Sequence, residues 1–272
     1  MNKKYNNDQI VALHSQGLSD AEIAEVVGCT ANQMANKRKS LGLEPNCIRD
    51  TYKLSDQELA IVIGTLLGDG CVKYVHNKCK YPMLSFSHCI EQEEYFLYKK
   101  DKLIKLMASY NKYYHANKQK DSWQYNGKNM ACLTEIRNIF YPNNIKILPI
   151  EFLKEHFTEE SIYYWYMDDG CYDKKTDSFI IATDCFNKDD LLKFTKFLKE
   201  KFNLDFSIKA DHELYLKHKS NDTFYNIISK YNECKSMQYK YILWSSRKTP
   251  LNGEIPEMDN PVLNPQETEE NA

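Results

Sequence analysis

The chain contains the same short pattern twice, an apolar run that ends in Asp-Gly-Cys. LLGDGC spans residues 66–71 and YMDDGC spans residues 166–171, so Asp69 and Asp169 occupy matching positions. In both halves the hydrophobic periodicity predicts the element order α-β-β-α-β-β-α. A chain that repeats a whole supersecondary unit folds as a diverged tandem repeat, and this constrains the architecture more than any other feature does.

The predicted elements of the first half start with an apolar helix over residues 54–70. The alternating segments CVKYV and MLSFSHC indicate two strands, followed by an amphipathic helix over 91–107. We then expect strands at SWQYN and NMACL and a short helix over 134–140. The second half repeats this order, with predicted helices over 158–169, 188–202 and 221–229.

Composition and charge divide the chain into five parts in an α+β fold. We expect a helix-turn-helix domain over 1–45, a linker over 46–54, repeats over 55–148 and 149–248, and an acidic disordered tail over 249–272. The formal net charge of −2 does not indicate a nucleic-acid binder, but residues 251–272 hold six acids and no Lys or Arg. The segment between the N-terminal part and the tail is therefore mildly basic, which supports DNA binding weakly.

The N-terminal part reads as three short helices. Ser19 to Glu22 forms a capping box, Gly28 supplies a turn, and Thr30 can cap the third helix. Amides on the third helix can read adenine edges, and its basic side chains can hold phosphates. The candidate DNA-contacting residues there are Asn32, Gln33, Asn36, Lys37 and Arg38. The alternative that remains is a small helical bundle with a solvated basic helix.

Asp69 and Asp169 each stand at the carboxyl end of an apolar helix, the negative end of its dipole, where a carboxylate costs a few tenths to about 1 kcal/mol. Gly64, Thr65 and Gly68 give the first helix a small-residue surface. If the repeats pack about a pseudo-twofold axis, both carboxylates meet with the free carbonyls of Gly68 and Asp168. Such hard oxygen ligands favour Mg²⁺. The alternative is two ordinary capped helix ends with exposed aspartates.

The stretches VIGTLLGDG (62–70) and IYYWYMDDG (162–170) resemble the two motifs of LAGLIDADG homing endonucleases. The loop FYPNNIKILP, followed by a helix and the second motif, is similar to the linker of single-chain, intron-encoded members, and the resemblance covers roughly residues 55–245. It implies a saddle-shaped monomer that cuts both strands of a long, non-palindromic DNA target. The implied cofactor is Mg²⁺, with Mn²⁺ as a substitute, and the implied products carry short 3′ overhangs.

The resemblance also implies roles for individual residues. Asp69 and Asp169 would bind metal, one for each DNA strand, and Lys146 and Lys240 would polarise water or neutralise the transition state. Strands of each repeat would read the duplex, and their candidate residues are Lys73, Ser85, Ser87, Lys209, Asp211 and Lys217. In one departure from the family pattern, Tyr163, Tyr164 and Trp165 stand where the motif has small residues, which predicts a looser or asymmetric helix crossing.

Two other functions remain open on the sequence: an RNA maturase that binds intron RNA, and a DNA-binding regulator that does not cut. The nine cysteines contain no Cys-x-x-Cys pair, which favours reduced thiols over a structural zinc site. We expect neither a signal peptide nor a membrane span, because no long apolar run occurs. The predicted location is therefore not secreted: the cytoplasm or nucleoid of a bacterium or phage-infected cell, or an organelle matrix.

Overall fold

A computed structural model describes residues 6–16, 18–46, 48–76, 78–114, 121–231, 233–241 and 244. The predicted tail over 249–272 lies outside the described residues. The described part contains two four-stranded antiparallel sheets, which confirms the α+β class. None of the helices described is long and apolar enough to cross a membrane.

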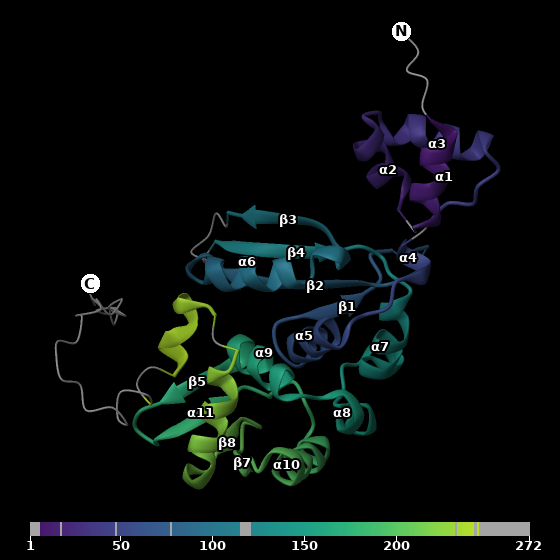
Figure 1. The fold of residues 1–272 in the computed structure, drawn as a ribbon. Helices are drawn as coiled ribbons and strands as arrows, with labels where there is room; N and C mark the ends of the chain where they lie inside the picture. Colours follow the sequence, from purple (N-terminus) through teal and green to yellow (C-terminus); the bar gives the residue numbers. More distant parts are fainter. Residues whose placement is uncertain are drawn as a thin grey trace, which may run out of the picture.

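The first repeat has the predicted order of elements (Figure 1). Its members are α5 (Asp56–Leu67), β1 (Cys71–Lys73), β2 (Met83–Cys89), α6 (Glu93–Lys102), β3 (Met107–Tyr113), β4 (Ser122–Gly127) and α7 (Cys132–Phe140). Short 3-10 turns flank α6, at Ile90–Gln92 and Ile104–Leu106. The strands lie in the order β1-β2-β4-β3, so β3 is an edge strand.

The second repeat follows the connecting helix α8 (Ile150–His156). Its members are α9 (Glu159–Asp169), β5 (Gly170–Asp173), β6 (Ser178–Ile181), α10 (Lys188–Phe202), β7 (Phe206–Ile208), β8 (Leu214–Leu216) and α11 (Asn221–Ser229). A 3-10 segment, η5 (Lys235–Lys240), lies C-terminal to α11. The strand order β5-β6-β8-β7 is the same as in the first sheet, so the tandem repeat is a repeat in three dimensions as well.

Two element predictions in the first repeat are wrong. The helix expected over 91–107 ends at Lys102, and residues 107–113 form β3 instead. NMACL is not a strand, because its last residues enter α7. Most residues of β3 are exposed, so the strand lacks the apolar alternation by which a sequence reveals a strand.

Helices α5 and α9 pack side by side at the centre of the molecule, and their contact depends on glycine (Figure 1). A Cβ at Gly64 would lie 2.6 Å from the Ser161 carbonyl oxygen and 2.7 Å from Tyr164 Cβ. A Cβ at Gly68 would lie 2.5 Å from Asp168 Cβ. The crossing is close and asymmetric, because small residues of α5 accommodate large residues of α9.

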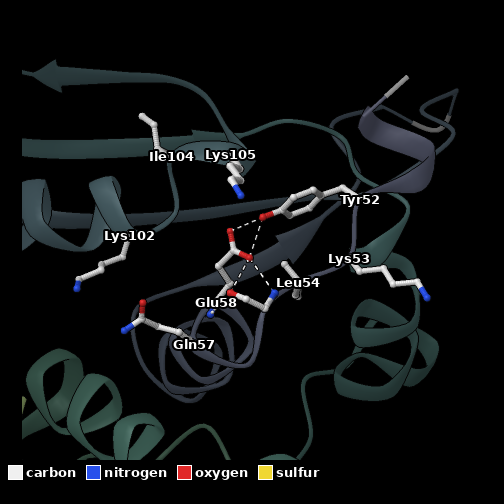
Figure 2. A pocket seen from close by; sticks show the side chains of 9 residues that line it. Tyr52, Lys53, Leu54, Gln57, Glu58, Lys102, Ile104 and Lys105 are labelled. Carbon is white, nitrogen blue, oxygen red and sulfur yellow. Dashed lines mark hydrogen bonds between the residues drawn. The ribbon is translucent and has the colours of Figure 1, made fainter. Parts of the chain in front are cut away.

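Both helices begin at a capping box, and this fixes where each one starts. At α5, Glu58 accepts hydrogen bonds from the Ser55 N–H and hydroxyl, each at 2.9 Å, and from Tyr52 Oη at 2.7 Å. Figure 2 shows this group in a cavity of about 370 Å³ rimmed by Lys53, Lys102 and Lys105. The Glu58 carboxylate is held by these hydrogen bonds, so it serves to fix the start of α5.

Three N-terminal helices form their own small core, apart from the two repeats (Figure 1). They are α1 (Asn7–Ser15), α2 (Asp20–Val27) and α3 (Ala31–Ser40), and the short α4 (Ile48–Thr51) leads to the first repeat. The capping boxes at Ser19 and Thr30 are present, and Gly28 has φ 73° in the left-handed region. The expectation that Arg38 is exposed is wrong, because its guanidinium is buried, 2.9 Å from Asp20.

Candidate active site

The carboxylates of Asp69 and Asp169 lie at the adjoining carboxyl ends of α5 and α9. Helix α9 ends at Asp169, while α5 ends at Leu67 and turns through Gly68. Burial and the neighbouring charges of Asp69 and Asp168 raise the pKa of Asp169 to about 7, although Lys146 and Lys240 oppose the shift. The charge of Asp69 therefore acts on Asp169, which places the two carboxylates in one electrostatic environment.

The two lysines predicted for catalysis lie at these same helix ends. Lys146 Nζ donates to the Gly68 carbonyl at 3.3 Å. Lys240 Nζ is buried and donates to the carbonyls of Met167 at 2.6 Å and Asp168 at 3.0 Å. Each ammonium group therefore compensates the negative end of one helix dipole. They occupy the carbonyls predicted as metal ligands, but a carbonyl oxygen keeps a second lone pair.

Burial lowers the pKa of Lys240, and the charges of Asp168, Asp69 and Asp169 oppose that shift. The segment η5 that carries Lys240 is held in place from both repeats. Tyr166 Oη donates to the Lys240 carbonyl at 2.7 Å, and the Ser236 N–H donates to Glu94 on α6 at 2.7 Å.

A buried cluster of polar side chains lies next to the paired carboxylates, and it was not predicted from the sequence. Asp168 accepts hydrogen bonds from Lys99 Nζ at 2.8 and 2.9 Å and from Tyr95 Oη at 2.8 Å. Lys99 Nζ lies 3.4 Å from His88 Nε2, and His88 Nδ1 lies 3.4 Å from Asp69 Oδ2. One signal was present in the sequence, because the alternation of β2 places His88 on the same face as the buried Leu84 and Phe86.

Asp69 and Asp169 differ in their electrostatic surroundings. Burial acts to raise the pKa of Asp69, but the contact with His88 and the charges of Lys99 and Lys240 hold it below its ordinary value. Asp169 has no comparable histidine contact among the residues that the structure describes, and its pKa is raised. The two carboxylates are therefore related by position in the repeat but not in their charge environment.

The predicted strand residues are distributed unevenly. Lys73 and Ser87 are exposed on the outer face of the first sheet. Ser85 is only 3% exposed, because β2 lies between β1 and β4, and the Gln124 amide donates to its hydroxyl at 3.4 Å. The expectation that Ser85 presents an accessible strand side chain is therefore wrong.

In the second sheet, the strand placement of three residues is wrong. Lys209 and Asp211 lie in the turn between β7 and β8, and both are exposed. Lys217 follows β8, where its ammonium group is 3.0 Å from Asp205. Asp205 also pairs with Lys199 and Lys219, which leaves a net positive patch at this end of the sheet.

The outer face of the first sheet carries short polar side chains. The strand register places Ser87, Gln124 and Asn111 in one row across β2, β4 and β3, and Asn126 and Ser109 in the next row on β4 and β3. Amide and hydroxyl groups in such rows can both donate and accept hydrogen bonds to base edges.

The two repeats bring two carboxylates and two ammonium groups together at the adjoining ends of α5 and α9. This arrangement defines a nuclease-type centre on a duplicated scaffold. The family model of the LAGLIDADG DNA endonuclease family matches residues 59–224. The chain belongs to the LAGLIDADG DNA endonuclease family.

Two curated proteins and a solved structure are also similar to this chain. The chain is 29% identical over 233 residues to the "Probable intron-encoded endonuclease 1" of Wickerhamomyces canadensis, covering 77% of this chain and 97% of the relative. An uncharacterized protein of Methanocaldococcus jannaschii is 25% identical over 217 residues, covering 73% and 79%. The solved structure of the homing endonuclease I-WcaI bound to its DNA recognition sequence matches with a TM-score of 0.63 at 25% sequence identity, covering 75% of this chain and 97% of that one.

Proposed function

We propose that this chain is a homing endonuclease that hydrolyses both strands of a long, non-palindromic DNA target and leaves short 3′ overhangs. It acts as a monomer in the intracellular compartment that holds its target. The observation that carries the proposal is the convergence of Asp69 and Asp169 at the adjoining ends of α5 and α9, with a lysine at each helix end.

Divalent metal ions fit this site, with Mg²⁺ as the proposed cofactor and Mn²⁺ as a substitute. Burial and the charges of Asp69 and Asp168 raise the pKa of Asp169 to about 7. A cation is favoured at this position because it would offset the negative charges that raise the pKa. The donor set of carboxylates and the carbonyls of Gly68 and Asp168 consists of hard oxygen atoms. Bound ions supply Lewis-acid chemistry that activates water and stabilises the leaving oxygen.

The chain's own residues supply orientation and charge. Asp69 and Asp169 each serve one DNA strand. Lys240 is fixed by its carbonyl contacts, so its charge stays beside the reacting phosphate without reorganisation. Lys146 is half-buried and makes one longer hydrogen bond, so its ammonium group is free to orient water or to neutralise charge on the phosphate.

The DNA surface follows from the same geometry. Ser87, Asn111, Gln124 and Asn126 on the first sheet read base edges in the major groove, with Lys73 beside them. The proposed contacts near the second sheet are Lys209 and Asp211, in the turn between β7 and β8, and Lys217, which follows β8.

The N-terminal unit, residues 1–45, extends the footprint through α3. Asn32, Gln33, Asn36 and Lys37 are its candidate contacts. Arg38 instead stabilises that unit through Asp20 and the Leu43 carbonyl.

A cleavage selection tests this proposal. The full chain is incubated with Mg²⁺ and a randomised duplex library, and the cut ends are sequenced. The expected result is one enriched long site with opposed cuts that leave short 3′ overhangs. The matched control is the Asp69→Asn/Asp169→Asn protein, which should yield no enriched ends. Equal enrichment from wild type and control, or no enrichment from wild type, would contradict the proposal.

A further inference from the structure

A continuous line of polar side chains runs through the protein interior from the second motif to the first. Both carboxylate oxygens of Asp168 accept hydrogen bonds from Lys99 Nζ, which lies 3.4 Å from His88 Nε2. His88 Nδ1 in turn lies 3.4 Å from Asp69 Oδ2. The side chains of Asp168, Lys99 and His88 are fully buried, whereas that of Asp69 is 40% exposed. The line therefore ends at a catalytic carboxylate.

Lys99 determines which nitrogen of His88 carries the proton. An ammonium group can only donate, so Nε2, which faces Lys99, accepts a hydrogen bond. Because Nε2 accepts this hydrogen bond, the proton of the ring resides on Nδ1. Nδ1 is buried and makes no full hydrogen bond among the residues that the structure describes. It lies 3.4 Å from Oδ2 of the partly exposed Asp69 carboxylate.

We propose that His88 is a positioning residue for Asp69, and that Lys99 and Asp168 hold the ring of His88 in the orientation and tautomer this requires. A hydrogen bond from Nδ1 to Oδ2 of Asp69 fixes the orientation of this carboxylate and leaves its other oxygen available to a ligand. This inference rests on the proposed function and deepens it, because the acid next to Asp169 in the second motif then controls the catalytic carboxylate of the first.

Among the residues that the structure describes, the arrangement occurs in the first repeat and not in the second. Cys71 pairs with Ser85 and Cys171 pairs with Ile180, so the register places Thr183 at the position that matches His88. The Thr183 hydroxyl donates to the carbonyl of His212. Asp169 therefore lacks the partner that Asp69 has.

A metal ion bound by the cluster itself is the competing explanation, since ligand atoms of Asp69, His88 and Asp168 lie within 4.8 Å of one another. Three hydrogen bonds from Lys99 and Tyr95 already hold the Asp168 carboxylate. A metal ion would have to displace the Lys99 ammonium group and remove the Nδ1 proton. The cluster as built supports Asp69 and does not form a separate metal site.

The tautomer is measured directly in the full-length protein by long-range ¹⁵N–¹H correlation spectra of the imidazole rings. His88→Asn identifies the His88 signals by their loss. The expected result at pH 7 is a neutral ring with the proton on Nδ1 and a bare Nε2. A proton on Nε2, or a doubly protonated ring, would overturn the proposal without reference to any activity.

Cleavage then tests the consequence for Asp69. His88→Phe removes the donor, and His88→Asn is the matched variant because its amide nitrogen replaces Nδ1. We expect the Mg²⁺ concentration for half-maximal cleavage to rise by about tenfold or more in His88→Phe. His88→Asn should recover most of this loss. Target affinity measured with Ca²⁺ should be the same in all three proteins.

The link to the second motif is tested in a paired variant, since removing Lys99 alone would leave Asp168 charged and unpaired in the interior. Lys99→Met/Asp168→Asn should raise the Mg²⁺ requirement as His88→Phe does, and adding His88→Phe to it should produce little further change. If the wild-type protein cuts its selected site but His88→Phe has the wild-type Mg²⁺ requirement, the inference is wrong. If the wild-type protein does not cut at all, the proposed function has failed instead.

Discussion

The closeness of α5 and α9 can be tested at Gly64. Ordinary contacts of a Cβ begin near 3.4 Å, and an added Cβ would lie 2.6 Å from a backbone oxygen and 2.7 Å from Tyr164 Cβ. Neither atom belongs to a side-chain end that can swing away, so the helices themselves must separate. Overpacking of this kind costs about 3 kcal/mol, and alanine regains about 1 kcal/mol of helix propensity, so Gly64→Ala should destabilise the protein by about 2 kcal/mol.

The assay is urea unfolding followed by circular dichroism, with the midpoint and slope fitted separately. The midpoint should fall and the slope should stay unchanged, and in a thermal scan the transition should fall by about 4–8 °C. Lys196→Ala on the exposed face of α10 is the control, expected within about 0.5 kcal/mol of wild type. If Gly64→Ala were neutral or more stable, helix propensity alone would govern the position and the close crossing would be refuted.

Three further predictions concern the centre and the N-terminal unit. Because the pKa of Asp169 is raised to about 7, the native state keeps a proton that the unfolded chain releases. The free energy of unfolding without metal should therefore fall as pH rises from about 4 to 7, and Asp169→Asn should abolish that trend in urea titrations. Lys240→Met should destabilise the protein by about 1–3 kcal/mol, because it leaves buried carbonyl groups without a hydrogen-bond donor. Lys146→Met should destabilise the protein less, because Lys146 makes a longer hydrogen bond. Equal urea midpoints for the two variants would contradict the structure. Deletion of residues 1–46 retains α4, whose Arg49 carbonyl accepts a hydrogen bond from the Ala131 N–H at 2.8 Å. The shortened protein should still cleave its target but bind it more weakly. Loss of folding, measured by circular dichroism, would show that the N-terminal helices are not a separate unit.

The elements that were predictable are those whose signal is local. The helices expected at 188–202 and 221–229 coincide with α10 and α11, because apolar periodicity and flanking polar residues mark both of them. The capping boxes at Ser19 and Thr30 were predictable for the same reason, since all their atoms lie within four residues. The edge strand β3 was missed because an exposed strand has no buried face to impose alternation.

The parts of the site that could not be predicted depend on contacts between distant segments. Asp168 and Lys99 are 69 residues apart in sequence, and nothing near either one reveals the other. Arg38 was predicted to contact DNA because it lies among the basic residues at the end of α3, whereas Asp20 of α2 draws its guanidinium inwards. Ser85 carries the polar identity of a surface residue, and only the neighbouring strands determine its burial.

In the proposed function, Asp69 and Asp169 form one catalytic centre with a site for each DNA strand. The most direct measurement is strand-resolved cleavage of a plasmid carrying the selected target, with each strand end-labelled, by wild type, Asp69→Asn and Asp169→Asn at equal DNA occupancy and saturating Mg²⁺. We expect double-strand cuts from wild type and loss of cutting of at least one strand in each variant. Cutting of both strands at the wild-type rate by either variant would contradict it.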